Sequence, residues 1–217
     1  MSDSSPLKIH PSAVVDEGAV IGDGTSIWHF SHICAGAVIG KRCSLAQNVL
    51  VADNASLGNN VKVQNNVAIY GGITVEDDVF LGPSCVLTNV TNPRSEVNRK
   101  SLYEKTLIRR GATIGANATI VCGITLGRYC FIGAGAVATK DIPDYGLVLG
   151  NPGKLSDYIS RHGHKLTFNE SGRATCLESK FVYEKADQQV RCLDLNEDDP
   201  LPSELSFGSQ DYDSFKS

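Results

Sequence analysis

Aliphatic residues recur at every sixth position along most of the chain. An amphipathic helix repeats about every 3.6 residues and a strand every two, so neither element alone produces this spacing. The longer run comprises Ile9, Val15, Ile21, Ile27, Ile33, Ile39, Leu45, Val51, Leu57, Val63, Ile69, Val75, Leu81 and Leu87. A second run, in a new phase, comprises Ile108, Ile114, Ile120, Leu126 and Ile132. The pattern therefore indicates a structure that repeats in units of six residues.

A small or β-branched residue follows the aliphatic positions by four residues, as at Ala13, Ala37 and Val49. Both positions would point inward from one short strand, and Gly or Asn would relieve the corner that follows. Three hexads then close a triangular coil, and residues eighteen apart stack in parallel register. Stacked coils bury one continuous core, which is typical of a β-helix. We therefore predict an all-β parallel β-helix over residues 1–151.

A polar insertion interrupts the hexads between the two runs. Residues 88–107 read TNVTNPRSEVNRKSLYEKTL and cannot fill a core. A polar insertion in a regular solenoid is usually a binding element on one face. The loop cations suit phosphate or carboxylate oxygens. We predict that Arg94 and Arg99 contact the substrate; the alternative for each, as for Lys100, is a solvated charge.

The corner from which the insertion departs is the predicted reaction centre. Counting back eighteen residues places Asn89 over Gly71, in a Gly-Gly pair whose bare backbone a ligand could approach closely. Counting forward past the insertion reaches Cys122, beside Gly123. We expect a backbone amide at Cys122 or Gly123 to donate to a developing oxyanion.

Other corners carry ladders of amide and aromatic side chains. Asn is also common at solenoid corners for structural reasons, so a purely structural role is the alternative for these ladders. The residues that we expect to contact the substrate are His29, Gln47, Asn48, Asn65, Asn66 and Tyr70.

The end of the second run reads IGAGAVATKDIPDYGLVLGNPGKL. It resembles the end-signature of the hexapeptide-repeat acyltransferases, GAGAVVTKDVP followed by G(N/V)PAK, with Gly153 where Ala is usual. The resemblance implies left-handed coils, a homotrimer, and acetyl-CoA bound between subunits. It also implies that backbone groups near Ala116 and Ala134 bind the pantetheine arm. Lys140, and more weakly Lys154, would then lie near the phosphates of the cofactor.

The chemistry of the acceptor is suggested by the lack of His in the inserted loop. A hydroxyl acceptor normally needs a general base, most often His. A neutral amine attacks without one, and the departing CoA thiolate can collect its proton. His29 and His32 lie about three coils before the insertion. The loop therefore favours an amine acceptor.

Four further stretches resemble one amine-directed subgroup, the UDP-2-acetamido-3-amino-2,3-dideoxy-D-glucuronate N-acetyltransferases. They read IWHFSHI, VKVQNNVAIYGGITVEDDVFLGPSCVLTN, NPRS and ATIVCGITLG. The resemblance implies acetylation of the 3-amino group of a UDP-linked uronate in O-antigen biosynthesis, with Asn89 orienting the amine. Two alternatives remain: a dTDP-linked 3- or 4-amino-6-deoxysugar as substrate, or sugar O-acetylation through His29 or His32.

Composition narrows the setting of this chemistry. A formal charge of −4 and a pI near 5.7 give no support for a nucleic-acid partner. No apolar run approaches the roughly 20 residues that span a membrane, and the start of the chain does not resemble a signal peptide. Seven Cys without close pairs favour reduced thiols in a cytoplasm. Cys43, Cys85 and Cys130 fall on core positions of the hexads.

The sequence changes character after Lys154. Residues 152–195 alternate between strand-like and turn-rich stretches and are expected to form a small cap containing a hairpin. Its His162, His164 and Cys176 do not complete the four ligands of a zinc site, and we expect no metal. The spacing of the histidines in the hexads also does not match a three-histidine zinc site. Residues 196–217 are acidic and are expected to form a flexible tail.

Overall fold

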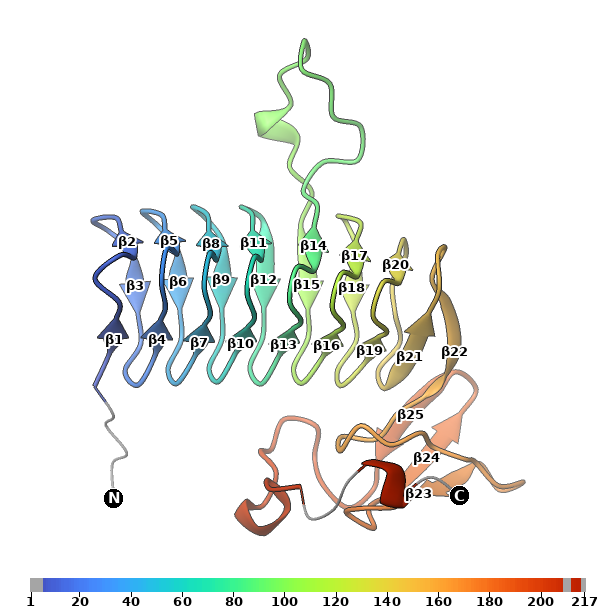
Figure 1. Cartoon of the computed structure of the whole chain (residues 1–217). Coiled ribbons are helices and arrows are strands. Elements are labelled where there is room, and N and C mark those ends of the chain that lie inside the picture. The colour runs from blue at the N-terminus through green and yellow to red at the C-terminus, as the bar shows by residue number, and fades with distance from the viewer. Residues whose placement is uncertain (1–5, 209–211, 216–217) are drawn as a thin grey trace.

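The computed structural model describes residues 6–208 and 212–215 and forms a triangular prism of short parallel strands (Figure 1). Strands that lie eighteen residues apart pair in register, as Ile27 does with Leu45. The register continues across the insertion, where Leu81 pairs with Ile114. From β1 the coils wind away from the N-terminus in the left-handed sense (Figure 1). The predicted all-β, left-handed parallel β-helix is confirmed.

Each of the three faces of the prism is a ladder of strands. Face A comprises β1 (Lys8–Ile9), β4 (Ser26–Ile27), β7 (Ser44–Leu45), β10 (Lys62–Val63), β13 (Phe80–Leu81), β16 (Thr113–Ile114), β19 (Phe131–Ile132), β21 (Gly146–Leu149) and the antiparallel β22 (Lys154–Tyr158). Face B comprises β2 (Val14–Val15), β5 (His32–Ile33), β8 (Leu50–Val51), β11 (Ala68–Ile69), β14 (Val86–Leu87), β17 (Thr119–Ile120) and β20 (Val137–Ala138). Face C comprises β3 (Val20–Ile21), β6 (Val38–Ile39), β9 (Ser56–Leu57), β12 (Ile73–Val75), β15 (Thr106–Ile108) and β18 (Thr125–Leu126).

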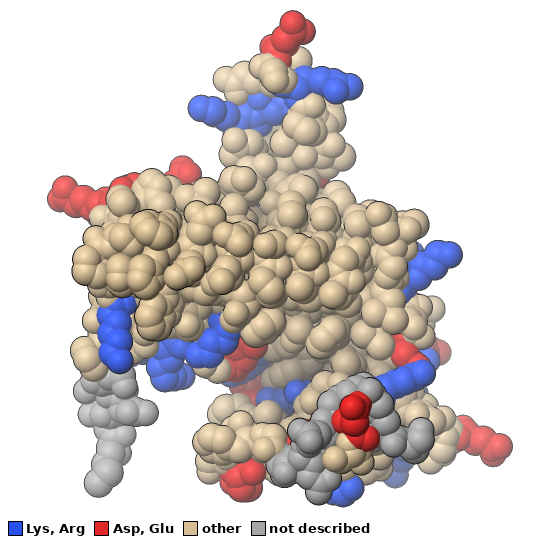
Figure 2. All heavy atoms as spheres, viewed as in Figure 1, with Lys and Arg blue, Asp and Glu red and all other residues tan. Residues whose placement is uncertain are grey.

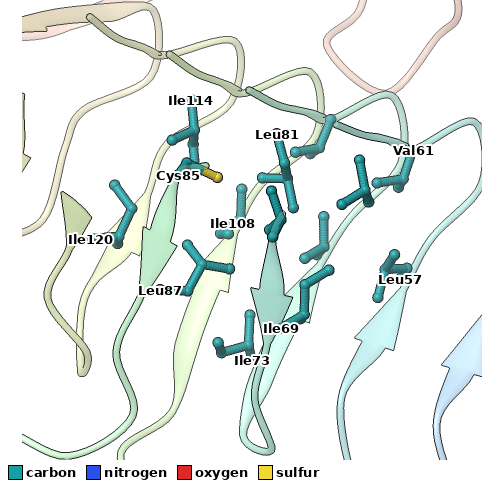
Figure 3. Close-up of a cluster of buried hydrophobic side chains, with 14 of the residues drawn as sticks. Leu57, Val61, Ile69, Ile73, Leu81, Cys85, Leu87, Ile108, Ile114 and Ile120 are labelled. Carbon is teal, nitrogen blue, oxygen red and sulfur yellow. The ribbon is translucent and has the colours of Figure 1, made fainter. Parts of the chain in front are cut away.

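The core lies along the axis of the prism and is built from the predicted inward positions. Leu81 and Ile114 are 0% exposed and stack with the aliphatic residues of neighbouring coils (Figure 3). The predicted core thiols Cys43, Cys85 and Cys130 are buried and free. Because stacking neighbours fill the whole interior, the prism is a rigid wall and its chemistry has to lie on its corners and insertions.

The insertion leaves the prism after β14 and returns at β15, and it contains one short 3-10 helix, η1 (Lys100–Leu102). It projects away from the corner between faces B and C (Figure 1). Strand β15 begins at Thr106, two residues before the boundary expected from sequence. The strand starts earlier because Thr106 already pairs with Ile73 of β12.

A three-stranded antiparallel sheet follows the prism within residues 152–195. It consists of β23 (Arg173–Thr175), β24 (Val182–Ala186) and β25 (Gln189–Cys192). Its buried Tyr183 meets Tyr145 edge-on with ring centroids 5.4 Å apart, and Tyr145 stacks on Tyr129. The two tyrosines of the prism thus extend from its corner into a second, smaller core.

The segment expected to be an acidic tail begins as a bound strap beneath this corner. The Tyr129 hydroxyl donates to the Glu197 carbonyl at 2.8 Å, and Arg128 pairs with Asp198 at 2.9 Å. Two 3-10 turns follow, η2 (Ser203–Leu205) and η3 (Tyr212–Phe215). Among the described residues, no helix has the length and apolar character needed to cross a membrane.

Candidate functional site

The predicted site residues lie at two different corners of the prism. The loop corner, between faces B and C, carries Asn89, Cys122 and Lys140 in one ladder, because Leu87 pairs with Ile120 and Ile120 with Ala138. The amide corner, between faces A and B, carries the predicted amide ladders. Face B separates the two corners, so a single chain does not bring the two sets together.

Hydrogen bonds tie the two ends of the insertion to the loop corner. The Glu104 amide donates to the Asn89 carbonyl at 2.9 Å and closes the stem of the loop. The Cys122 amide donates to the Thr88 hydroxyl at 2.9 Å, and the Gly123 amide donates to the Thr106 hydroxyl at 3.1 Å. Each amide already has an acceptor within the chain. Contrary to the expectation from sequence, neither Cys122 nor Gly123 offers a free N–H to a developing oxyanion.

Sequence reasoning missed the carboxylate of Glu104 at this corner. Its Oε1 accepts a hydrogen bond from the Thr91 amide at 3.1 Å, a shorter one from the Thr91 hydroxyl, and the thiol of Cys122 at 3.5 Å. The bond from the Thr91 hydroxyl is the main cause that holds the pKa of Glu104 below its ordinary value. The group is therefore ionised at neutral pH.

A signal for Glu104 was present in the sequence. It precedes Ile108 by four residues, as Gly71 precedes Val75 and Cys122 precedes Leu126. Counting backward from the second run of hexads would thus have placed it in the same ladder as the predicted reaction centre.

A cavity of about 530 Å³ lies between the inserted loop and the loop corner. The predicted bare backbone of Gly71 and Gly72 lines it, together with Asp53, Lys100 and Tyr103. Tyr70, next to this glycine pair, is 39% exposed. The side chain of Asn89 is half-buried and forms no hydrogen bond with the described residues.

The outer part of the loop carries most of its positive charge. Arg94 and Arg99 line a second cavity of about 620 Å³ with Tyr103. The Nε atom of Arg99 is buried without a hydrogen-bond partner in the described part of the chain. Lys and Arg side chains gather on the projecting loop, away from the body of the prism (Figure 2). The second cavity therefore brings together Arg94, Arg99 and Lys100.

At the amide corner, strand register places five predicted residues in one ladder. They are His29, Gln47, Asn65, Ala116 and Ala134. Part of this ladder has a structural role, because Asn65 Oδ1 accepts a hydrogen bond from the backbone amide of Gln47 at 3.2 Å.

The adjacent ladder, with Asn48 and Asn66, has a backbone reason for its composition. Both residues have a positive φ, 58° and 62°, which Asn tolerates better than most residues. The side-chain Nδ2 of Asn48 also donates a hydrogen bond to Asn66 Oδ1 at 3.0 Å. These contacts give the two side chains a structural role, and they leave Asn48 Oδ1 without a bond to the described residues.

The histidines of the prism do not converge on one point. His29 stacks on His10 with ring centroids 3.5 Å apart, whereas His32 pairs with Asp16 at 3.1 Å, near the thiol of Cys34. None of these rings lies at the inserted loop. Lys154, the weaker of the two predicted cofactor contacts, begins β22 at the far end of face A.

The chain is similar to proteins of a known family. The model of the bacterial transferase hexapeptide family (six repeats) matches residues 18–53, 54–89 and 105–140. A dTDP-3-amino-3,6-dideoxy-alpha-D-galactopyranose 3-N-acetyltransferase from Aneurinibacillus thermoaerophilus is 42% identical over 175 residues, which cover 81% of this chain and 90% of that protein.

Sugar O-acetyltransferases are also similar over shorter lengths. A galactoside O-acetyltransferase from Lactococcus lactis subsp. lactis (strain IL1403) is 32% identical over 108 residues, covering 45% of this chain and 52% of that protein. The structure of a maltose O-acetyltransferase from Clostridium difficile 630 aligns with a TM-score of 0.50 and 29% identity, covering 58% of this chain and 70% of that one. The chain belongs to the bacterial hexapeptide transferase family and is an acyltransferase.

Proposed function

We propose that this protein transfers the acetyl group of acetyl-CoA to the 3-amino group of a nucleotide-linked amino sugar. The observation that carries the proposal is the chemistry of the loop corner. The amide side chain of Asn89, which forms no hydrogen bond with the described residues, shares this corner with the ionised carboxylate of Glu104. The histidines of the prism lie elsewhere. This combination suits an amine, which needs orientation and charge complementarity more than a general base.

In the proposed reaction, the neutral amine attacks the thioester carbonyl and forms a new N–C bond. The C–S bond of the tetrahedral intermediate then breaks, and the thiolate of CoA takes the proton that the nitrogen loses. Asn89 Oδ1 accepts a hydrogen bond from the amine and directs its lone pair toward the carbonyl carbon. The hydrogen bond from the amine to Asn89 positions the reacting atoms, and no protein group has to accept the proton.

We infer that the catalytic unit is a homotrimer in the cytoplasm. Because the loop corner and the amide corner lie on opposite edges of face B, one chain supplies only half of a cleft. A second copy would bring its amide corner, with Ala116 and Ala134 for the pantetheine arm, against the loop corner of the first. Lys140 stands one coil beyond Cys122 and is exposed, which suits a phosphate contact.

Two sugars are candidates for the acceptor. The UDP-linked 2-acetamido-3-amino-glucuronate is supported by the cations that line the loop cavity, since Arg94 or Arg99 would neutralise its carboxylate. A dTDP-linked 3-amino-3,6-dideoxyhexose is supported by the relative that is 42% identical. Both carry the same amine on the same sugar carbon, so the proposed chemistry is shared.

The proposal is tested by thiol release from acetyl-CoA with each nucleotide sugar and with a 3-hydroxyl analogue. We expect turnover of at least one amino sugar and none of the hydroxyl compound. In the active pair, Asn89→Ala should lower kcat/KM at least tenfold, whereas Asn92→Ala, at an exposed position of the same loop, should stay within about twofold. Turnover of the hydroxyl analogue would refute the base-free reaction and direct attention to His29 and His32.

A further inference from the structure

Glu104 has a second carboxylate oxygen, Oε2, which lies beside Gly123 at the loop corner. Oε1 is held by Thr91 and Cys122, whereas Oε2 forms no hydrogen bond with the described residues. A Cβ atom built on Gly123 would lie 2.5 Å from Oε2. The absence of a side chain at Gly123 therefore keeps the space beside Oε2 clear.

The carboxylate of Glu104 is held through Oε1 and through its backbone. Glu104 follows the closed stem of the loop, where its own amide donates to the Asn89 carbonyl. Its backbone sits against the preceding coil, because a Cβ atom on Gly72 would lie 3.2 Å from the Glu104 carbonyl. Glycines thus flank Glu104 on both sides along the prism axis, and Oε1 is anchored. A free carboxylate oxygen held in this way is a preformed site for a cationic donor.

We propose that Glu104 is the residue that selects an ammonium group over a hydroxyl at the acceptor position. This inference rests on the proposed function and adds a specificity determinant to it. A sugar amine is protonated in much of its population at neutral pH, and the resulting ammonium donates a charge-assisted hydrogen bond to Oε2. A hydroxyl can donate to the same oxygen, but it carries no positive charge and lacks the ion-pair attraction of the ammonium.

Glu104 does not serve as the final proton acceptor in this scheme. Its pKa lies below the ordinary value, so it holds a proton poorly at neutral pH. The ammonium first loses one proton to water. The resulting amine stays between Oε2 and Asn89 and attacks the thioester, and its second proton leaves with the CoA thiolate. Atoms and charge balance without an additional reactant.

The test is a binding measurement that does not depend on turnover. Calorimetry at pH 7, with the protein free of acetyl-CoA, compares the 3-amino nucleotide sugar with its 3-hydroxyl analogue. In the natural protein the amino compound should bind about fivefold more tightly, the upper end for a solvent-accessible ion pair. In Glu104→Gln that ratio should fall to near one, through weaker binding of the amino compound alone. An unchanged ratio would overturn the proposal.

Thr91→Val provides the control for a structural role. This variant removes the hydroxyl that anchors Oε1 and leaves the carboxylate charge in place. If Glu104 selects the ammonium, Thr91→Val retains the amino preference. If Glu104 only fastens the loop, both variants weaken the two ligands equally, and the proposal fails.

Kinetics distinguish failure of this inference from failure of the proposed function. Absence of turnover with both amino sugars would contradict the proposed function. The ratio of the two binding affinities would still test the role of Glu104. In an active enzyme, Glu104→Gln should also move the acidic limb of the kcat profile to lower pH. The reason is that the carboxylate raises the pKa of the bound amine. An acidic limb that does not move would count against the ammonium contact.

Discussion

Replacing Gly123 with Ala tests the loop corner through a single added methyl group. Gly123 has a φ of 83°, and the new Cβ would lie 2.5 Å from Glu104 Oε2. Contacts under 3.0 Å do not persist, so the carboxylate has to move. The substitution therefore displaces Oε2 without changing the charge of the site.

Gly36 is a matched control because it occupies the equivalent corner position, three residues after the inward aliphatic Ile33. Its φ is 78°, and a Cβ atom built there meets nothing within 4 Å. Ala in the left-handed region costs roughly 1–2 kcal/mol at either position. For a chain of this size each kcal/mol lowers Tm by about 2–4 °C. Both variants should therefore lose stability, and Gly123→Ala somewhat more because of the contact with Glu104.

Activity is expected to separate the two variants. Gly123→Ala should lower kcat/KM for the amino sugar about fivefold, the loss expected for one solvent-accessible ion pair. Gly36→Ala should stay within about twofold of the natural protein. The assay is thiol release at matched protein concentration, well below both melting transitions. Equal activity of the two variants would refute the claim that the space beside Oε2 is functional.

Three other predictions concern the core, the loop stem and the thiols. Leu81→Ala, at a residue that is 0% exposed, should cost about 2–5 kcal/mol in guanidinium unfolding, and Phe80→Ala, at an outward-facing position, much less. Ionised Glu104 stabilises the loop stem at pH values above the ordinary pKa of Glu, and this stabilisation is lost as the pH falls through the lowered pKa of Glu104. Hydrogen exchange of the Thr91 amide, corrected for intrinsic rates, should therefore accelerate at low pH in the natural protein. The Glu104→Gln variant should show no such acceleration. A thiol reagent should modify Cys34 first, because the other six cysteines are buried, and Cys34→Ser should abolish this fast phase.

The prism was predictable because its sequence repeats the same physical requirement many times. Every inward position, such as Leu81 or Ile114, needs an apolar residue, and the pairing of strands eighteen residues apart follows from three hexads in a coil. The same counting correctly placed Asn89 in register with Cys122. Errors at single positions do not accumulate in such a pattern.

The contacts at the loop corner were not predictable in the same way, because the insertion has no repeat. The strand register predicts which residues stack at this corner. It does not predict that the hydroxyls of Thr88 and Thr106 accept hydrogen bonds from the amides of Cys122 and Gly123, which were expected to face an oxyanion. Counting backward from Ile108 could have placed Glu104 in the ladder, but not the hydrogen bonds of its carboxylate with Thr91 and Cys122. Here a local side-chain hydrogen bond overrides what backbone position alone suggests.

The second core was missed for a related reason. Tyr129 and Tyr145 occupy corner positions with φ of 54° and 62°, where Asn or Gly would be the usual choice. Their rings serve the antiparallel sheet rather than the prism. The position alone is not a signal of a packed neighbour, because Phe30 also has a positive φ, 58°, and is 70% exposed.

The measurement that tests the account most directly is thiol release with paired acceptors that differ only at the third carbon, amino in one and hydroxyl in the other. It is run with both the UDP-linked uronate and the dTDP-linked 6-deoxy sugar. The account predicts turnover of an amino compound and none of either hydroxyl compound. Comparable turnover of an amino sugar and its hydroxyl partner would contradict it, because Asn89 cannot take a proton and the lowered pKa of Glu104 makes that carboxylate a poor general base for a hydroxyl.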